Sequence, residues 1–254
     1  MNGLDLFSLK GKKVLITGAD RGIGFSLACA LASAGADIVA TYRSGDISKL
    51  DNFCKENGYS LSVYRLDLAN RDNIYATINE IIEKEISIDV LINNAGTIQR
   101  KPAADHDDLM WDEVLSINLD AQFILSKAFG KQMVEKKQGK IIFICSLLSF
   151  QGGINVPSYT ASKSAIAGLI KALSNEWAAF GVNVNGIAPG YIITDNTKAL
   201  REDEERNASI LSRIPCGRWG SPEDLSGAAI FLASSASNYV NGAILVVDGG
   251  WLAR

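Results

Sequence analysis

A glycine-rich turn near residue 20 constrains the fold more than any other feature of the chain. A β-branched, apolar run at residues 12–17 leads into G-A-D-R-G-I-G at residues 18–24, and an amphipathic, alanine-rich helix is expected to follow to residue 34. A strand, a glycine turn and a helix N-terminus in this order form a site where backbone N–H groups and the helix dipole receive a pyrophosphate. Gly18 would allow the tight turn, Gly22 the approach of a phosphate, and Gly24 the packing of the helix on the strand. The sequence therefore predicts nucleotide binding.

The rest of the chain alternates between strand-like and helix-like segments. Further strands are expected at residues 37–42, 61–66, 88–92, 140–146, 182–187 and 243–247, and helices at residues 46–57, 70–85, 111–136, 157–177 and 222–233. This alternation predicts an α/β fold, a Rossmann-type doubly wound parallel sheet of about seven strands. The 254 residues, 47% of them hydrophobic, suit a single domain, residues 1–254. Residues 191–215 are polar and lack a core pattern, so we expect a lid over a substrate site.

Composition excludes several classes of function. The formal net charge is −3 without a basic run, which argues against a nucleic-acid surface. No stretch has the roughly 18 apolar residues of a membrane span, and residues 1–10 lack a signal-peptide pattern. The four cysteines are scattered, as is typical of reduced thiols. We therefore expect a cytoplasmic location. His106 is the only histidine, which excludes zinc sites built from several histidines; its polar neighbours predict a solvated loop residue.

Tyr159 and Lys163 suggest proton chemistry. They lie one turn apart in a predicted helix with Pro157 in its first turn, and Ser146 ends a predicted strand. A free phenol has a pKa of about 10, and a neighbouring ammonium group favours the phenolate. Ser146 could hold a carbonyl or hydroxyl oxygen against the phenol while another group moves a hydride. The same spacing also arises by accident, with the tyrosine packed and the lysine solvated.

Two further features concern the cofactor and a buried amide. An acidic residue after the second strand would mark NAD, but the chain reads Tyr42-Arg43 there. Arg43 and Arg21 could pair with the 2′-phosphate of NADP, or both could be solvated. Asn118 lies among apolar residues of a predicted helix, where an amide is costly unless it is bonded, so it would hold a kink or a water.

These motifs together resemble the short-chain dehydrogenase/reductase family over essentially the whole chain. The resemblance rests on T-G-x-x-x-G-I-G at residues 17–24, N-N-A-G at residues 93–96, Ser146 thirteen residues before Tyr159, Y-x-x-x-K, and P-G at residues 189–190. It implies hydride transfer between NAD or NADP and a secondary alcohol or ketone. The implied catalytic residues are Asn118, Ser146, Tyr159 and Lys163, and no metal is implied. The implied cofactor residues are Gly18, Asp20, Arg21, Gly22, Ile23, Gly24, Tyr42, Arg43, Asp67, Leu68, Asn94, Ala95, Gly96, Tyr159, Lys163, Pro189, Gly190, Ile192 and Thr194.

Within that family the chain is most similar to the branch of 2-deoxy-D-gluconate 3-dehydrogenases, also called 2-keto-3-deoxy-D-gluconate 5-dehydrogenases. Residues 149–153, 156–163, 175–179, 201–207, 217–220 and 247–254 carry this similarity. It implies interconversion of 2,5-diketo-3-deoxygluconate and 2-keto-3-deoxygluconate in uronate breakdown. The branch generally uses NAD(H), whereas Arg21 and Arg43 favour NADP, so both cofactors stay open. Such a keto sugar acid needs a cation and hydroxyl partners. The candidates, beside Ser146 and Tyr159, are Arg100, Gln151, Asn196 and Arg206.

Family members are usually homotetramers. The last predicted helix and strand, with Trp251, would suit a subunit interface, or they could simply close the core.

Two other functions are compatible with the same fold. A 3-oxoacyl carrier-protein reductase or another sugar-alcohol dehydrogenase is the first, although four carboxylates at residues 202–205 disfavour an acidic carrier protein. A nucleotide-binding regulator without turnover is the second, and it would not need Ser146, Tyr159 and Lys163.

Overall fold

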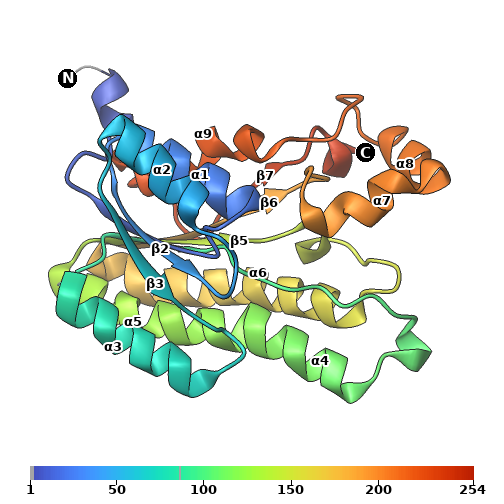
Figure 1. Cartoon of the computed structure of the whole chain (residues 1–254), viewed down its shortest axis with the longest axis horizontal. Coiled ribbons are helices and arrows are strands. Elements are labelled where there is room, and N and C mark those ends of the chain that lie inside the picture. The colour runs from blue at the N-terminus through green and yellow to red at the C-terminus, as the bar shows by residue number, and fades with distance from the viewer. Residues whose placement is uncertain (1–2, 86) are drawn as a thin grey trace.

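A seven-stranded parallel sheet forms the centre of the molecule (Figure 1), as the alternating pattern predicts. The computed structural model describes residues 3–85 and 87–254. The strand order is β3-β2-β1-β4-β5-β6-β7, and the order reverses between β1 and β4, where open sheets of this kind bind ligands. The strands are β1 (Lys13–Thr17), β2 (Asp37–Tyr42), β3 (Leu61–Arg65), β4 (Val90–Asn93), β5 (Gly139–Ile144), β6 (Val182–Pro189) and β7 (Ile244–Val247).

Burial explains the composition of the strands. Every residue of β4, β5 and β6 is buried, because helices cover both faces of the sheet, and these strands are accordingly rich in valine and isoleucine. The two outer strands, β3 and β7, contain exposed positions. The hydrophobic pattern therefore distinguishes central strands from edge strands.

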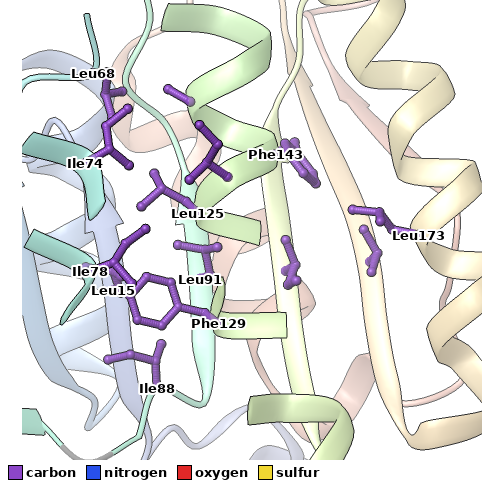
Figure 2. Packing of buried hydrophobic residues seen from close by; sticks show 14 of the residues in the cluster. Leu15, Leu68, Ile74, Ile78, Ile88, Leu91, Leu125, Phe129, Phe143 and Leu173 are labelled. Carbon is purple, nitrogen blue, oxygen red and sulfur yellow. The ribbon is translucent and has the colours of Figure 1, made fainter. Parts of the chain in front are cut away.

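Two layers of helices enclose the sheet (Figure 1). The helices α1 (Gly22–Ser33), α2 (Ser48–Asn57) and α9 (Ser226–Ala233) cover one face, with Leu27, Leu31 and Leu50 in their core. The helices α3 (Arg71–Glu85), α4 (Asp108–Leu115), α5 (Ala121–Lys136) and α6 (Pro157–Trp177) cover the other. Phe129 and Phe143 are fully buried under this second layer, as Figure 2 shows.

One predicted helix is interrupted. In place of a continuous helix over residues 111–136, α4 and α5 are separated by a π-helical turn, Ser116–Asp120, with Asn118 at its centre. The Asn118 side chain bonds the backbone of Thr97, which lies outside the helix, and this contact accompanies the wider turn. The kink expected at Asn118 therefore takes the form of an inserted π turn.

The segment expected to lack a core pattern is largely helical. It contains a 3₁₀ turn (Asp195–Thr197), α7 (Lys198–Glu202) and α8 (Glu204–Leu211). Ile210 and Ile214 pack with Leu147, Trp219 and Trp251 into a small apolar cluster of their own. Trp251 thus closes a local core within the chain.

A backbone bridge joins the start of that segment to a residue shortly after its end. Ile192 pairs with Gly220 in an isolated parallel bridge, in which the Ile193 N–H donates to the Gly220 carbonyl at 2.8 Å. The Gly220 N–H in turn donates to the Tyr191 carbonyl at 2.9 Å. The polar segment therefore leaves and rejoins the body of the protein at one place.

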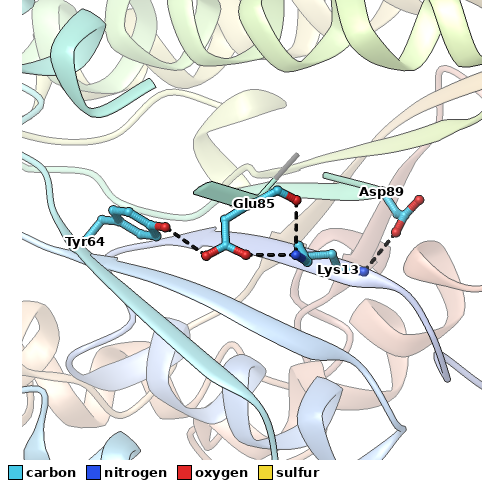
Figure 3. Close-up of polar contacts among 4 residues, drawn as sticks. All are labelled: Lys13, Tyr64, Glu85 and Asp89. Atoms are coloured by element: carbon cyan, nitrogen blue, oxygen red, sulfur yellow. Dashed lines mark hydrogen bonds and ion pairs between the residues drawn. The ribbon is translucent and has the colours of Figure 1, made fainter. Parts of the chain in front are cut away.

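Polar contacts at the amino end of β1 tie three elements together (Figure 3). The Lys13 ammonium donates to Glu85 Oε2 at 2.8 Å, and the Tyr64 hydroxyl donates to Glu85 Oε1 at 2.8 Å. The Lys13 N–H also donates to Asp89 Oδ2 at 2.9 Å. Burial would raise the pKa of Glu85, but the hydrogen bonds from Lys13 and Tyr64 outweigh it and lower the pKa below its usual value.

Two expectations from composition are met by the described residues. Cys29, Cys54, Cys145 and Cys216 are all free thiols. No helix within residues 3–85 and 87–254 is long and apolar enough to cross a membrane.

Candidate active site

The carboxyl ends of the central strands open into one cleft of about 740 Å³, which the segment after β6 borders. Of the site residues predicted from the sequence, only Asn118 does not line it. The lining residues include Gly18, Asp20, Arg21, Gly22, Ile23, Gly24, Tyr42, Arg43, Asp67, Leu68, Asn94, Ala95, Gly96, Arg100, Ser146, Gln151, Tyr159, Lys163, Pro189, Gly190, Ile192, Thr194, Asn196 and Arg206. Residues spread over most of the chain thus meet where a doubly wound sheet binds its ligand.

The glycine turn has the geometry of a phosphate cradle. Gly18 and Gly22 have φ of 66° and 54°, in the left-handed region that favours glycine. A Cβ atom at Gly24 would clash with the Gly18 carbonyl, so the helix can pack on the turn only with glycine there. Arg21 provides no side-chain cap for α1, which leaves the first N–H groups of the helix for a ligand. These residues fit the pyrophosphate of a dinucleotide.

Asn94 and Thr17 hold the floor of the cleft in place. The Asn94 side-chain amide donates to the carbonyls of Thr17 and Gly18 at 2.8 and 3.1 Å. The Thr17 hydroxyl oxygen accepts from the N–H groups of Asn94 and Ala95, both at 3.0 Å. These bonds join the ends of β1 and β4, so the glycine turn is fixed before any ligand arrives.

Lys163 is buried next to Tyr159. Lys163 is only 3% exposed. Its ammonium group donates to the carbonyl of Ile144, at the end of β5, at 2.7 Å. The same nitrogen lies 5.7 Å from the centroid of the Tyr159 ring. One turn of α6 separates the two residues and places both on the cleft. A buried positive charge therefore stands beside a phenol that faces the ligand space.

Ser146 follows β5 and is oriented by a local turn. Its hydroxyl oxygen accepts from the Leu148 N–H at 3.1 Å, which leaves the hydroxyl proton to donate. Ser149 donates to the Lys163 carbonyl at 2.9 Å and so ties this turn to α6. Cys145 also lines the cleft, but burial raises the pKa of its thiol to about 11, which keeps it protonated and unsuited to nucleophilic attack.

Asn118 lies behind the cleft wall and is fully buried. Its Oδ1 accepts from the Thr97 N–H at 2.8 Å, and its Nδ2 donates to the Thr97 carbonyl at 2.8 Å and to Ser162 Oγ at 3.2 Å. Ser162 in turn donates to the Tyr159 carbonyl at 2.8 Å. The amide therefore connects the π turn to the helix that carries Tyr159.

His106 lies in a loop, as predicted, but it is half-buried rather than fully solvated. His106 Nε2 lies 2.9 Å from the hydroxyl of Ser158, the residue before Tyr159, and His106 Nδ1 is buried without a hydrogen-bond partner in the part of the chain described. The tertiary contact spans 52 residues, so the polar neighbours in the sequence gave no sign of it.

The candidate substrate residues differ in how they are held. Arg100 Nη2 donates to the Asn196 carbonyl at 3.0 Å, and Gln151 Oε1 accepts from the indole N–H of Trp251 at 3.4 Å. The Arg206 side chain, on α8, contacts no protein anion among the described residues. Sequence reasoning missed Arg213, which also lines the cleft. Its only sequence signal is its place in the polar segment, where solvated cations are common.

The cleft is positively charged although the chain is negative overall. Six cationic residues and three carboxylates line it, against a formal net charge of −3 for the whole chain. The cations are Arg21, Arg43, Arg100, Lys163, Arg206 and Arg213, and the carboxylates are Asp20, Asp67 and Asp195. Such a surface attracts anionic ligands. Within residues 3–85 and 87–254, no cluster of three or more histidine, cysteine or carboxylate side chains could hold a metal.

Comparison with known proteins agrees with this geometry. The profile of a family described as "Enoyl-(Acyl carrier protein) reductase" matches residues 18–252. A 2-dehydro-3-deoxy-D-gluconate 5-dehydrogenase of Pseudoalteromonas atlantica is 58% identical over 253 residues, which cover 99% of this chain and 100% of that one.

Two solved structures are similar over nearly their full length. A protein of Agrobacterium tumefaciens with bound NADP is 50% identical with a TM-score of 0.93, covering 98% of this chain and 100% of that one. A gluconate 5-dehydrogenase of Burkholderia cenocepacia, in complex with NADP and tartrate, is 38% identical with a TM-score of 0.94, covering 100% of both chains. The fold, the cleft and these relatives together show that the chain is an NAD(P)-dependent oxidoreductase and belongs to the short-chain dehydrogenase/reductase family.

Proposed function

We propose that this enzyme interconverts 2-keto-3-deoxy-D-gluconate, which is 2-dehydro-3-deoxy-D-gluconate, and 2,5-diketo-3-deoxygluconate in the breakdown of uronates. The observation that carries the proposal is the meeting of Ser146, Tyr159 and Lys163 with the glycine turn in one cationic cleft. The name of the 58% identical relative supports this substrate. A secondary alcohol at C5 would be oxidised, or the corresponding ketone reduced.

The roles of the catalytic residues follow from their positions. A bound nicotinamide dinucleotide supplies or accepts the hydride. Tyr159 donates its hydroxyl proton to the substrate oxygen during reduction and takes a proton from it during oxidation. Ser146 donates a hydrogen bond to the same oxygen, and Lys163 places its positive charge beside the phenol. Asn118 holds the π turn against α6 and supports a water that relays protons to and from Tyr159.

The residues along the cleft divide between the parts of the dinucleotide. The glycine turn holds the pyrophosphate, and Asp67 and Leu68 hold the adenine. Arg21 and Arg43 favour NADP over NAD, because neither guanidinium has a protein partner among the described residues and two similar solved structures contain NADP. The remaining cofactor contacts are proposed for Tyr42, Asn94, Ala95, Gly96, Pro189, Gly190, Ile192 and Thr194.

The substrate lies under the segment of residues 191–215, which acts as the lid of this single dinucleotide-binding domain. Arg100 and Arg206 supply positive charge, and Gln151 and Asn196 supply polar contacts to hydroxyl groups. The four free cysteines support a cytoplasmic location. Exposed apolar residues on α5 and on the edge strand β7 support a homotetramer.

The test is a comparison of wild type and Tyr159→Phe with 2-keto-3-deoxygluconate. We expect turnover by the wild type with NADP, and loss of at least about 10³-fold in kcat in the variant, which lacks only the proton-transferring hydroxyl. NADPH affinity, measured by fluorescence titration, should change less than about threefold. Rapid turnover by Tyr159→Phe would refute the catalytic role, and no turnover by the wild type would refute the substrate.

A further inference from the structure

Arg213 lines the cleft with a free positive charge. Its guanidinium lies over the indole of Trp251, 4.0 Å from the ring centroid. In the described part of the chain its side chain has no hydrogen-bond or ion-pair partner besides this ring. Stacking uses the face of a guanidinium and leaves the N–H donors at its edge, which form a fork that matches a carboxylate.

The platform under Arg213 is rigid. Trp251 is only 4% exposed, and its ring centroid lies 4.7 Å from that of Tyr191. Its indole N–H donates to Gln151 Oε1, so the ring is fixed by packing and by a hydrogen bond. A cation on a fixed surface loses less conformational freedom when it binds a ligand than a cation on a mobile side chain.

Residues 248–254, which include Trp251, also hold the backbone of Arg213. Arg254 donates from Nη2 to the Ser212 carbonyl at 2.7 Å and from Nε to the Arg213 carbonyl at 3.3 Å. Asp248 accepts from the N–H groups of Gly250 and Leu252, both at 2.8 Å, and so shapes the turn that carries Trp251. In Figure 1 the C-terminal end lies beside α8, consistent with these bonds. Residues 248–254 therefore position Arg213 through both its side chain and its backbone.

The other two lid-side cations of the cleft are less suited to one defined contact. Arg100 already donates through Nη2 to the Asn196 carbonyl. Arg206 has no contact among the described residues that would orient its guanidinium. Of these three arginines, only Arg213 is both oriented by a ring and unpaired with a protein acceptor.

We propose that Arg213, held on Trp251, binds the carboxylate of the substrate and sets the preference of the enzyme for a sugar acid over a neutral sugar. The proposal rests on the proposed function, since it names the group that recognises one end of that substrate. Arg206 and Arg100 then add long-range attraction rather than the defined carboxylate contact.

The test compares 2-keto-3-deoxygluconate with its uncharged methyl ester in steady-state oxidation with NADP. In Arg213→Gln we expect KM for the acid to rise about 10- to 100-fold, with kcat and all constants for the ester changed less than about threefold. Arg213→Lys keeps the charge but not the planar fork, and should lose most of the same preference. Trp251→Leu should raise KM for the acid and leave KM for the ester nearly unchanged. Trp251→Phe, which keeps an aromatic ring under Arg213, should retain more of the preference for the acid.

The control is Lys198→Gln, which removes a lid cation that pairs with Glu202 and does not line the cleft. It should leave the acid-to-ester ratio unchanged. Equal losses of kcat/KM for acid and ester in Arg213→Gln would overturn the proposal. An equal loss of preference for the acid in Lys198→Gln would also overturn it. So would a loss of preference found in Arg206→Gln but not in Arg213→Gln.

A binding measurement separates this proposal from the proposed function. If the wild type turns over neither compound, the substrate is wrong, and Arg213 is then tested by calorimetric titration of the NADP-loaded protein with tartrate. Tartrate binding at least tenfold weaker in Arg213→Gln supports a carboxylate site at Arg213. Equal affinity in both proteins, or no binding to the wild type, overturns it.

Discussion

At the scale of single residues, two arginines without protein partners among the described residues lie at the end of the cleft where we propose that the cofactor binds. Arg21 and Arg43 both line the cleft and are exposed, and neither forms an ion pair with a described residue. A guanidinium left unpaired beside a ligand site gains most from an anionic ligand, and the 2′-phosphate is the group that distinguishes NADP from NAD.

We predict that Arg43→Ala raises KM for NADPH about 10- to 100-fold and KM for NADH less than threefold, since only the phosphate loses its partner. The measurement is the ratio of kcat/KM for the two cofactors with one saturating substrate. Arg65→Ala removes a cation outside the cleft lining together with its bond to the Arg43 carbonyl, so it tests whether a shift of the Arg43 backbone alone changes the ratio; we expect the ratio to stay unchanged. A parallel fall for both cofactors in Arg43→Ala would mean that Arg43 only supports the fold.

The sequence identified the residues that belong to its motifs, but it missed partners that are set only by contacts between distant parts of the chain. Tyr159 and Lys163 share one helix, so their proximity follows from helix geometry. Arg213 reaches its platform at Trp251, 38 positions away, and His106 meets Ser158, 52 positions away. No local pattern specifies such pairs, and both residues read as ordinary solvated side chains.

At the scale of elements, the contacts around Glu85 join α3 to β1 and β3 (Figure 3). The lowered pKa of Glu85 means that its ionised form is favoured in the folded state. Its contribution to stability is therefore present above the unfolded value of about 4.3 and is lost as the pH falls through the lower folded pKa. The pKa of Tyr64 is raised, first by burial and then by Glu85, so its contribution is present below about pH 10 and is lost above that.

We predict that Glu85→Gln lowers the free energy of unfolding by about 1–3 kcal/mol at pH 7, because Lys13 and Tyr64 lose a charged acceptor. The difference from wild type should shrink as the pH falls towards 3. Urea unfolding at fixed protein concentration, at several pH values, measures both effects. Glu80→Gln, which removes an exposed pair with Lys84 on the same helix, should cost less than about 0.5 kcal/mol; an equal cost would contradict the assignment.

Element positions were more predictable than their irregularities. All seven predicted strands and most helices lie where the hydrophobic pattern indicated, since each repeats its own period over many residues. The π turn at Ser116–Asp120 depends on the bonds between Asn118 and Thr97, which come from another part of the chain. The sequence marked Asn118 as a costly residue but not the geometry that satisfies it.

At the scale of the whole molecule, several large apolar side chains of the described residues are exposed, among them one on α5 and two on the edge strand β7. Phe123 on α5 is 41% exposed, and Leu245 and Val246 on β7 are 38% and 36% exposed. They lie on a helix and on an edge strand, so association through both surfaces would produce a tetramer with two kinds of interface.

We predict a mass in solution of four times the 27.3 kDa of one chain, measured by analytical ultracentrifugation. Phe123→Glu and Leu245→Glu should each yield dimers, because each removes one interface and leaves the other. Val63→Glu, at the opposite edge strand β3, should leave the tetramer intact. A wild type that sediments as a monomer at micromolar concentration would rule out this assembly.

The backbone bridge beside the polar segment, residues 191–215, determines where that segment can change. The bridge between Ile192 and Gly220 fixes the chain on either side of residues 193–219, so we expect a change of length in the exposed part of this stretch to leave β6 in place. The entropic cost of a longer loop grows only slowly with its length. Length can therefore vary at the exposed turns of this segment, whereas Ile210 and Ile214 must keep their packing against Leu147 and Trp251.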